Sequence, residues 1–182
     1  MFSSAQHEYI GRVAHTLQVI VGTMAVGVLM FVGMVFFLSP QNAQGAAGTM
    51  PIITYMAVGM AVAVTVAWII VPGMVVGRMR QSVIERDVAK WGLVRNIPNI
   101  DELEDIAPLA AIYQTRTIIG AAFFEGAAFL ATVAYLIERQ RLAIYIAIVL
   151  ILLLVTQIPT VSRLADWIEH ELASIQQTRQ MR

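Results

Sequence analysis

One carboxylate, Glu125, lies in the middle of a long apolar stretch and is the residue best placed to carry chemistry. An ionised carboxylate at the centre of a membrane-spanning helix costs on the order of 3 kcal/mol. No Lys, Arg or His lies at a matching depth in the other apolar stretches, so the chain offers Glu125 no salt bridge. Beside it, Ala122-x-x-x-Gly126 is a small-residue pattern that lets two helices approach closely.

Two interpretations of Glu125 remain open from the sequence. Either the carboxyl group is protonated and donates a hydrogen bond between helices, or a cation or a water-filled cavity supports its charge. Thr132 lies on the same helical face, and Thr23 and Thr65 are hydroxyl partners from other stretches. We therefore take Glu125 and Thr132 as a candidate proton or cation site, with interhelical hydrogen bonding as the alternative role of Glu125.

The segment 123–130, with the sequence FFEGAAFL, resembles the carboxylate-bearing helix of rotary ATPase proteolipids. In that family an acidic residue among small residues carries the proton or the sodium ion. The resemblance implies an ion-binding role for Glu125 alone. It is confined to this one segment of the chain.

Signatures of other chemistry are missing from the sequence. There is no cysteine, and neither His7-Glu8 nor His170-Glu171 is followed by the second histidine of a zinc protease helix. There is no nucleophile elbow, phosphate-binding glycine loop or dinucleotide fingerprint. Because twelve basic residues balance twelve acidic ones, no cationic excess attracts nucleic acid. We expect no enzyme, no cofactor, no metal site and no nucleic-acid partner.

The composition places these residues in a membrane protein. The 182 residues are 58% hydrophobic and only 13% charged. Four apolar runs each approach the roughly 20 residues that a helix needs to cross a bilayer. They span residues 19–38, 52–71, 117–137 and 142–161. We expect an all-α fold, an integral membrane four-helix bundle that forms the single domain 1–182.

The basic residues predict the orientation of the chain, since cytoplasmic segments carry an excess of Lys and Arg. Only Arg139 and Arg141 fall on one side of the four runs. The other side holds Arg12, Arg78, Arg80, Arg86, Lys90, Arg95, Arg116, Arg163, Arg179 and Arg182. We therefore expect a multi-pass protein of the plasma or inner membrane, with both termini in the cytoplasm.

Short connections predict which helices are neighbours. The turn 138–141 is so tight that the third and fourth runs must form an antiparallel hairpin, and we expect the first two runs to pair likewise. An internal repeat of the two hairpins is suggested by two correspondences. Gly22 corresponds to Gly120, and Pro72 corresponds to Pro159.

Amphipathic helices are expected on the cytoplasmic side, within the loop 74–112 and at the C-terminus over 160–177. The C-terminal segment has one apolar stripe at helical spacing. The stripe comprises Val161, Leu164, Ala165, Ile168, Leu172 and Ile175. We expect these cytoplasmic helices to pack on each other rather than lie on lipid. Pro108 is suited to the first turn of a helix that continues into the third run.

The sequence does not identify a reaction or a transported substrate. The function that it favours is a structural or interaction subunit of a membrane assembly, in contact with the lipid bilayer and with copies of itself or other membrane subunits. The alternative is a proteolipid-like subunit that translocates protons or cations through Glu125.

Overall fold

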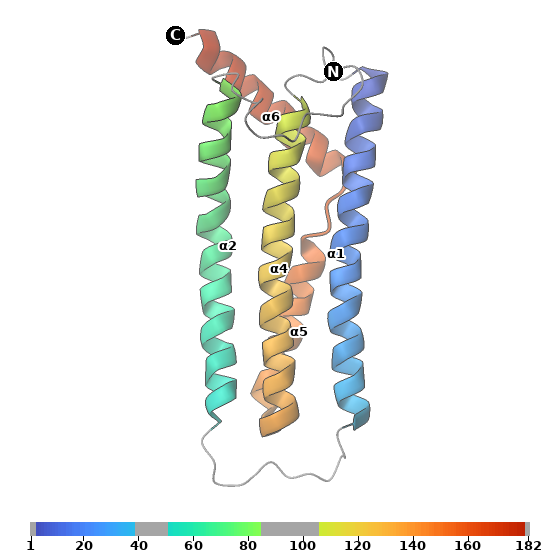
Figure 1. The fold of residues 1–182 in the computed structure, drawn as a ribbon, viewed down its shortest axis with the longest axis vertical. Coiled ribbons are helices and arrows are strands. Elements are labelled where there is room, and N and C mark those ends of the chain that lie inside the picture. Colours follow the sequence, from blue (N-terminus) through green and yellow to red (C-terminus); the bar gives the residue numbers. More distant parts are fainter. Residues whose placement is uncertain (1–2, 39–50, 85–105, 181–182) are drawn as a thin grey trace. The chain divides into compact units, whose positions relative to one another are not determined.

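The computed structural model describes residues 3–38, 51–84 and 106–180, and every regular element among them is an α-helix. Figure 1 shows these helices along the chain. They are α1 (Ser4–Leu38), α2 (Ile52–Ile84), α4 (Ile106–Glu138), α5 (Arg141–Thr156) and α6 (Val161–Gln180). The all-helical prediction is confirmed for these residues. The expected helical segment 74–112 lies partly outside them, and its described parts belong to the end of α2 and the start of α4.

Three helices are long and apolar enough to cross a membrane, namely α1, α2 and α4. A fourth span is reached only if α5 and α6 are taken together across the break between them. The expected run 142–161 is interrupted because α5 ends at Thr156 and α6 begins at Val161. Pro159 lies in this break, where its ring and its missing N–H prevent the helix from continuing. With 16 residues, α5 measures about 24 Å, less than the roughly 30 Å of hydrocarbon in a bilayer.

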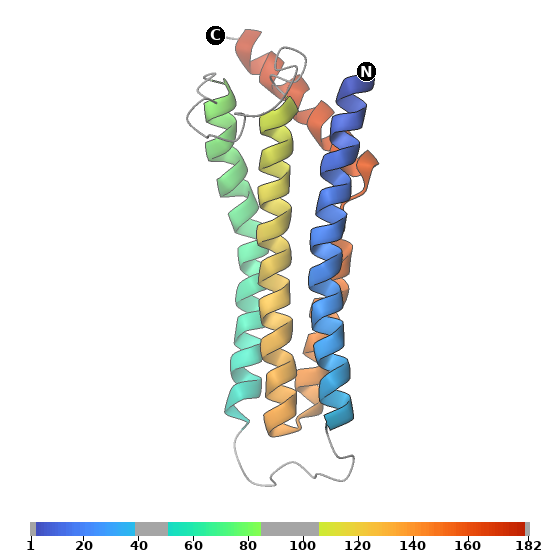
Figure 2. The same ribbon diagram turned by 45° about the vertical axis from the view of Figure 1, so that its right-hand side comes forward.

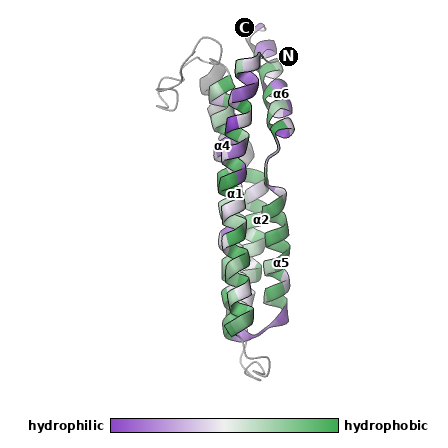
Figure 3. Cartoon of the chain, turned by 90° about the vertical axis from the view of Figure 1, so that its right-hand side faces the viewer, coloured by the Kyte–Doolittle hydropathy of each residue, from purple (hydrophilic) through white to green (hydrophobic). Residues whose placement is uncertain are grey.

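The described chain divides into two compact units, and whether residues 1–182 form one domain stays a prediction. Unit 1 comprises 1–19, 71–118 and 159–182, and unit 2 comprises 20–70 and 119–158. Unit 2 holds only four charged residues, which are Glu125, Glu138, Arg139 and Arg141. Figure 3 shows hydrophobic residues along the helices of this unit and a mixture of hydrophilic and hydrophobic residues along α6.

Unit 2 also carries nearly all the large apolar side chains that are exposed. In the described residues, all of them except Val19, Met74 and Val161 belong to this unit. Phe37 is 93% exposed and Met30 is 72% exposed. An apolar surface of this extent is foreign to a soluble monomer and typical of a surface that faces lipid. By helix length and hydropathy, the chain is a candidate multi-pass membrane protein.

Helix α4 is the inner helix of unit 2. In the most apolar 18-residue segment of each helix, 50% of α4 is buried, against 22% of α1 and 17% of α2. Its side chains join those of α1, α2 and α5 in one core, in which Phe124, Ala127 and Ala128 are almost completely buried. Figures 1 and 2 both place α4 between the unit 2 parts of α1 and α2. The carboxylate found in the sequence is therefore on the most enclosed helix.

Ring contacts show that α1 runs parallel to α4. Phe31 contacts Phe129 with ring centroids 5.2 Å apart, and Phe36 contacts Tyr135 at 5.8 Å. On the other side, Trp68 of α2 contacts Phe124 at 5.9 Å. Among the described residues no ring contact joins α1 to α2. Each of the first two spans thus makes ring contacts with α4, and their pairing with each other stays a prediction.

The hairpin of α4 and α5 is confirmed. Small residues from both helices form a shared core of Ala131, Ala134, Ala143, Ile144 and Ala147. The turn between them consists of Arg139 and Gln140, and Arg139 adopts a left-handed conformation with φ of 57°. This conformation reverses the chain over two residues, as left-handed residues do after helix C-termini.

Unit 1 has its own apolar core, built from the start of α1, the start of α4 and one face of α6. Leu164 and Ile168 of α6 are fully buried against Ile10 of α1 and Leu109 of α4. The amphipathic C-terminal helix is therefore confirmed, and its apolar stripe packs on protein except at Val161, which is exposed. Its described partners are the first turns of α1 and α4, which places the start of α1 and the start of α6 in the same unit.

The residues that suggested an internal repeat differ from each other in structure. Helix α2 continues through Pro72 to Ile84, whereas the chain breaks at Pro159. A Cβ atom added to Gly120 would lie 3.2 Å from Cδ1 of Trp68, while one added to Gly22 would meet nothing within 4 Å. The correspondence of the two halves does not extend to these local structures.

Candidate functional site

Glu125 lies on the side of α4 where the buried face of the helix meets its exposed face. The carboxylate is half-buried, Ala121 and Ala128 beside it are fully buried, and Gly126 is exposed. Glu125 makes no hydrogen bond or ion pair with any residue that the structure describes. The core around it is apolar and contains no cation that would stabilise an ionised carboxylate.

The hydroxyl groups that we expected near Glu125 have other partners. Thr132 is buried and donates a hydrogen bond of 2.7 Å to the carbonyl oxygen of Ala128, one turn back on α4. Thr65 donates to the carbonyl oxygen of Ala61 at 2.8 Å on α2. Such bonds to the preceding turn are common for threonine in helices and satisfy the hydroxyl within its own helix. The pairing of Glu125 with Thr132 as a cation site stays a prediction.

The exposed face next to Glu125 consists of small residues. Ala122 and Gly126 lie one turn apart on α4 and are both exposed. A Cβ atom added to Gly126 would meet nothing within 4 Å, so packing within the chain does not require glycine there. Glycine costs a helix about 1 kcal/mol relative to alanine. Gly126 thereby leaves room for a close approach by a helix from outside the chain.

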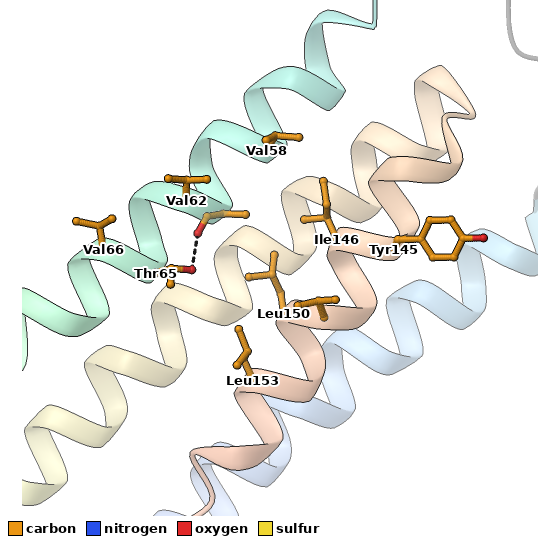
Figure 4. A pocket seen from close by; sticks show the side chains of 10 residues that line it. Val58, Val62, Thr65, Val66, Tyr145, Ile146, Leu150 and Leu153 are labelled. Carbon is orange, nitrogen blue, oxygen red and sulfur yellow. Dashed lines mark hydrogen bonds between the residues drawn. The ribbon is translucent and has the colours of Figure 1, made fainter.

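A cavity of about 450 Å³ lies between α2 and α5 within unit 2, as Figure 4 shows. Its lining residues are Val58, Ala61, Val62, Thr65, Val66, Tyr145, Ile146, Val149, Leu150 and Leu153. The Thr65 hydroxyl, which is already bonded to Ala61, is one of only two side-chain polar groups in this lining. The cavity therefore suits an apolar group.

A second carboxylate, Glu138, has a defined partner that sequence reasoning missed. Its Oε1 accepts the N–H of Ile53 at 2.6 Å and its Oε2 accepts the N–H of Thr54 at 2.8 Å. These N–H groups belong to the first turn of α2. The N–H groups of a first turn have no carbonyl partner within the helix, and they form the positive end of the helix dipole. Glu138 thus ties the end of α4 to the start of α2.

We expect Glu138→Ala to loosen the first turns of α2, because two charge-assisted hydrogen bonds are lost. Amide hydrogen exchange should become severalfold faster at Ile53 and Thr54 and stay unchanged in α6. Glu138→Gln should have a smaller effect, since its amide oxygen still accepts one bond. The matched control is Gln140→Ala, at an exposed neighbour. Equal exchange in the alanine variant and the native chain would show that the cap contributes nothing.

Metal-ligating side chains do not cluster in the described parts of the chain. No group of three or more His, Asp or Glu residues there could hold a metal ion. Comparison with known proteins adds no assignment: no family model, no curated protein and no solved structure matches this chain.

Proposed function

We propose that this chain is a structural or interaction subunit of a membrane assembly and that it associates with copies of itself, without an enzymatic activity. The observation that carries the proposal is the isolated carboxyl group of Glu125, half-buried on the inner helix and without a partner in the described chain. A polar group in hydrocarbon is stabilised by a hydrogen bond from a neighbouring helix. A second copy of the chain supplies such a group in the form of its own Glu125.

The proposed contact surface is the outward face of α4 formed by Ala122, Glu125 and Gly126. The two small residues let a second helix approach until backbones are close, which is the arrangement that favours association in lipid. Open space beside Gly126 is available for that helix. Two protonated carboxyl groups can then hydrogen-bond to each other across the contact.

The proposed location is the plasma or inner membrane, with the ends of the chain in the cytoplasm. Unit 1 contains both terminal segments and most of the basic residues, and unit 2 has Arg139 and Arg141 at the turn between α4 and α5. The excess of basic residues in unit 1 supports a cytoplasmic position for it.

Cysteine cross-linking tests the proposed contact, because the chain has no cysteine of its own. Ala122→Cys should form a disulfide-linked dimer in membranes under mild oxidation, since two Cα atoms must come within about 7 Å for this bond. Leu152→Cys is the control, as Leu152 is 60% exposed on α5, away from the proposed contact. Dimers from Leu152→Cys and none from Ala122→Cys would refute the proposal.

Ion translocation is the second candidate function, and the unbonded state of Glu125 in mid-span is the observation that favours it. The two candidates differ in what Glu125→Gln does. Glutamine keeps hydrogen-bonding groups but cannot exchange a proton, so association should persist in a structural subunit and proton flux into vesicles should be unchanged. A flux that the native chain supports and Glu125→Gln abolishes would establish the translocator instead.

A further inference from the structure

Two arginines in unit 1 are brought together by one aromatic contact between α4 and α6. Tyr113 of α4 and Trp167 of α6 lie with their ring centroids 5.4 Å apart. Arg116 follows Tyr113 by three residues and Arg163 precedes Trp167 by four. Residues at these spacings share a helix face. Each arginine is therefore on the same face as the aromatic ring of its own helix.

The two guanidinium groups share one neighbour, the phenol of Tyr113. Both act on it electrostatically. Neither Arg116 nor Arg163 makes an ion pair with the part of the chain that the structure describes. Two cations that have no ion-pair partner among the described residues can together bind an anion.

Two hydrogen bonds hold the backbone around Arg163 at the start of α6. The hydroxyl of Thr160 accepts the N–H of Arg163 at 3.3 Å and caps the start of α6. The side-chain amide of Gln18 donates to the carbonyl oxygen of Pro159 at 2.9 Å, which holds the start of α6 to α1. The anion site is thus built on ordered elements, which lowers the entropy cost of binding.

The sequence positions of the two arginines match the headgroup layer of a bilayer. Arg116 directly precedes the apolar run 117–137, and Arg163 follows the run 142–161. Tyr and Trp are enriched at the same depth, where their rings lie among lipid headgroups. An anion at this depth is the phosphate of a membrane lipid.

We propose that Arg116 and Arg163, flanked by Tyr113 and Trp167, bind the phosphate group of an anionic phospholipid in the cytoplasmic leaflet. The inference rests on the membrane location given under Proposed function. Arginine pairs well with phosphate because its planar donors bind two oxygens at once. The lipid tail lies beside the apolar runs, so a phospholipid is favoured over free phosphate.

Tryptophan fluorescence of the full chain in mild detergent tests this site. Trp68→Phe and Trp91→Phe leave Trp167, which contacts Tyr113 at the site, as the only tryptophan. Titration with phosphatidylglycerol should change the Trp167 emission in a saturable way. Phosphatidylcholine and inorganic phosphate at equal concentrations should leave it unchanged. A response to inorganic phosphate equal to that to phosphatidylglycerol would overturn the assignment to lipid.

Charge variants test the role of the arginines. Arg116→Gln and Arg163→Gln should each weaken binding of phosphatidylglycerol about fivefold, the effect of one basic residue near an anionic surface. Arg141→Gln is the control. It removes one charge at the first residue of α5 and should leave binding of phosphatidylglycerol unchanged. Equal loss in all three variants, or none in the first two, would overturn the proposal. Cross-linking through Ala122→Cys should persist in the arginine variants, so failure of this inference is distinguishable from failure of the proposed association.

Discussion

Replacing Gly126 with isoleucine should dissociate the proposed oligomer while each chain stays folded. The Cβ atom that this substitution adds has nothing of its own chain within 4 Å, so the branch point of the side chain fits without displacing a neighbour. It would occupy the space through which a second α4 approaches. We expect association to weaken by a factor of ten to a hundred, which is about 1.4–2.8 kcal/mol. Energy transfer between labelled chains in liposomes measures this change.

The matched control for this variant is Gly59→Ile on α2. Gly59 is also exposed and also has open space around it, but it lies away from the proposed contact. Association should be unchanged in this control, and thermal stability should be similar in the two variants. Normal association of Gly126→Ile would mean that the outward face of α4 is not the contact.

Truncation of Leu164 to alanine should weaken the packing of α6 against the starts of α1 and α4 in unit 1. Leu164 is fully buried, together with Ile10, Leu109 and Ile168, in the core that joins α6 to the starts of α1 and α4. Loss of a buried leucine side chain costs about 2–5 kcal/mol because a cavity remains. The energy required to open α6 should fall by this amount. Amide hydrogen exchange over 161–180 measures it, and unit 2 should show no change.

Val161→Ala provides the comparison on the same helix. Val161 is 45% exposed, so its truncation should change the opening energy by no more than about 0.5 kcal/mol. If both variants open α6 equally, the apolar stripe does not hold the helix. Unchanged exchange in Leu164→Ala would lead to the same conclusion.

Much of the helical architecture could be predicted from the spacing of residues. The stripe containing Leu164 and Ile168 predicts both the existence of α6 and the face that it buries. Pro108 predicts the start of the long α4, and the short polar turn before Arg141 predicts the α4–α5 hairpin. These features depend on local periodicity or on a short connection, and both are written in adjacent residues.

Long-range neighbours were harder to predict, because apolar spans resemble each other in composition. Nothing in the sequence of α1 indicates that Phe31 contacts α4 rather than α2. The sequence places Glu138 only in a turn. Its hydrogen-bond partners are the backbone N–H groups of Ile53 and Thr54, which lie far away in the chain. Because almost all residue types carry the same backbone N–H group, the sequence does not indicate which of them donates to a carboxylate.

The candidate site was located by sequence, but its surroundings were not. Glu125 stood out because a charge in hydrocarbon requires an explanation. Thr132 was chosen as its partner by spacing, yet its hydroxyl bonds to Ala128. Spacing places residues on a face, whereas the choice of hydrogen-bond partner depends on side-chain rotamers and on the nearest carbonyl group.

The central claim is that unit 2 lies in lipid while both ends of the chain are cytoplasmic. Single cysteines at positions 7, 139 and 170 test it most directly, with a membrane-impermeant maleimide applied to intact cells. We predict that only Arg139→Cys is labelled in intact cells. His7→Cys and His170→Cys should be labelled after the membrane is opened. Labelling of position 7 or 170 in intact cells, or recovery of the chain in the soluble fraction, would contradict it.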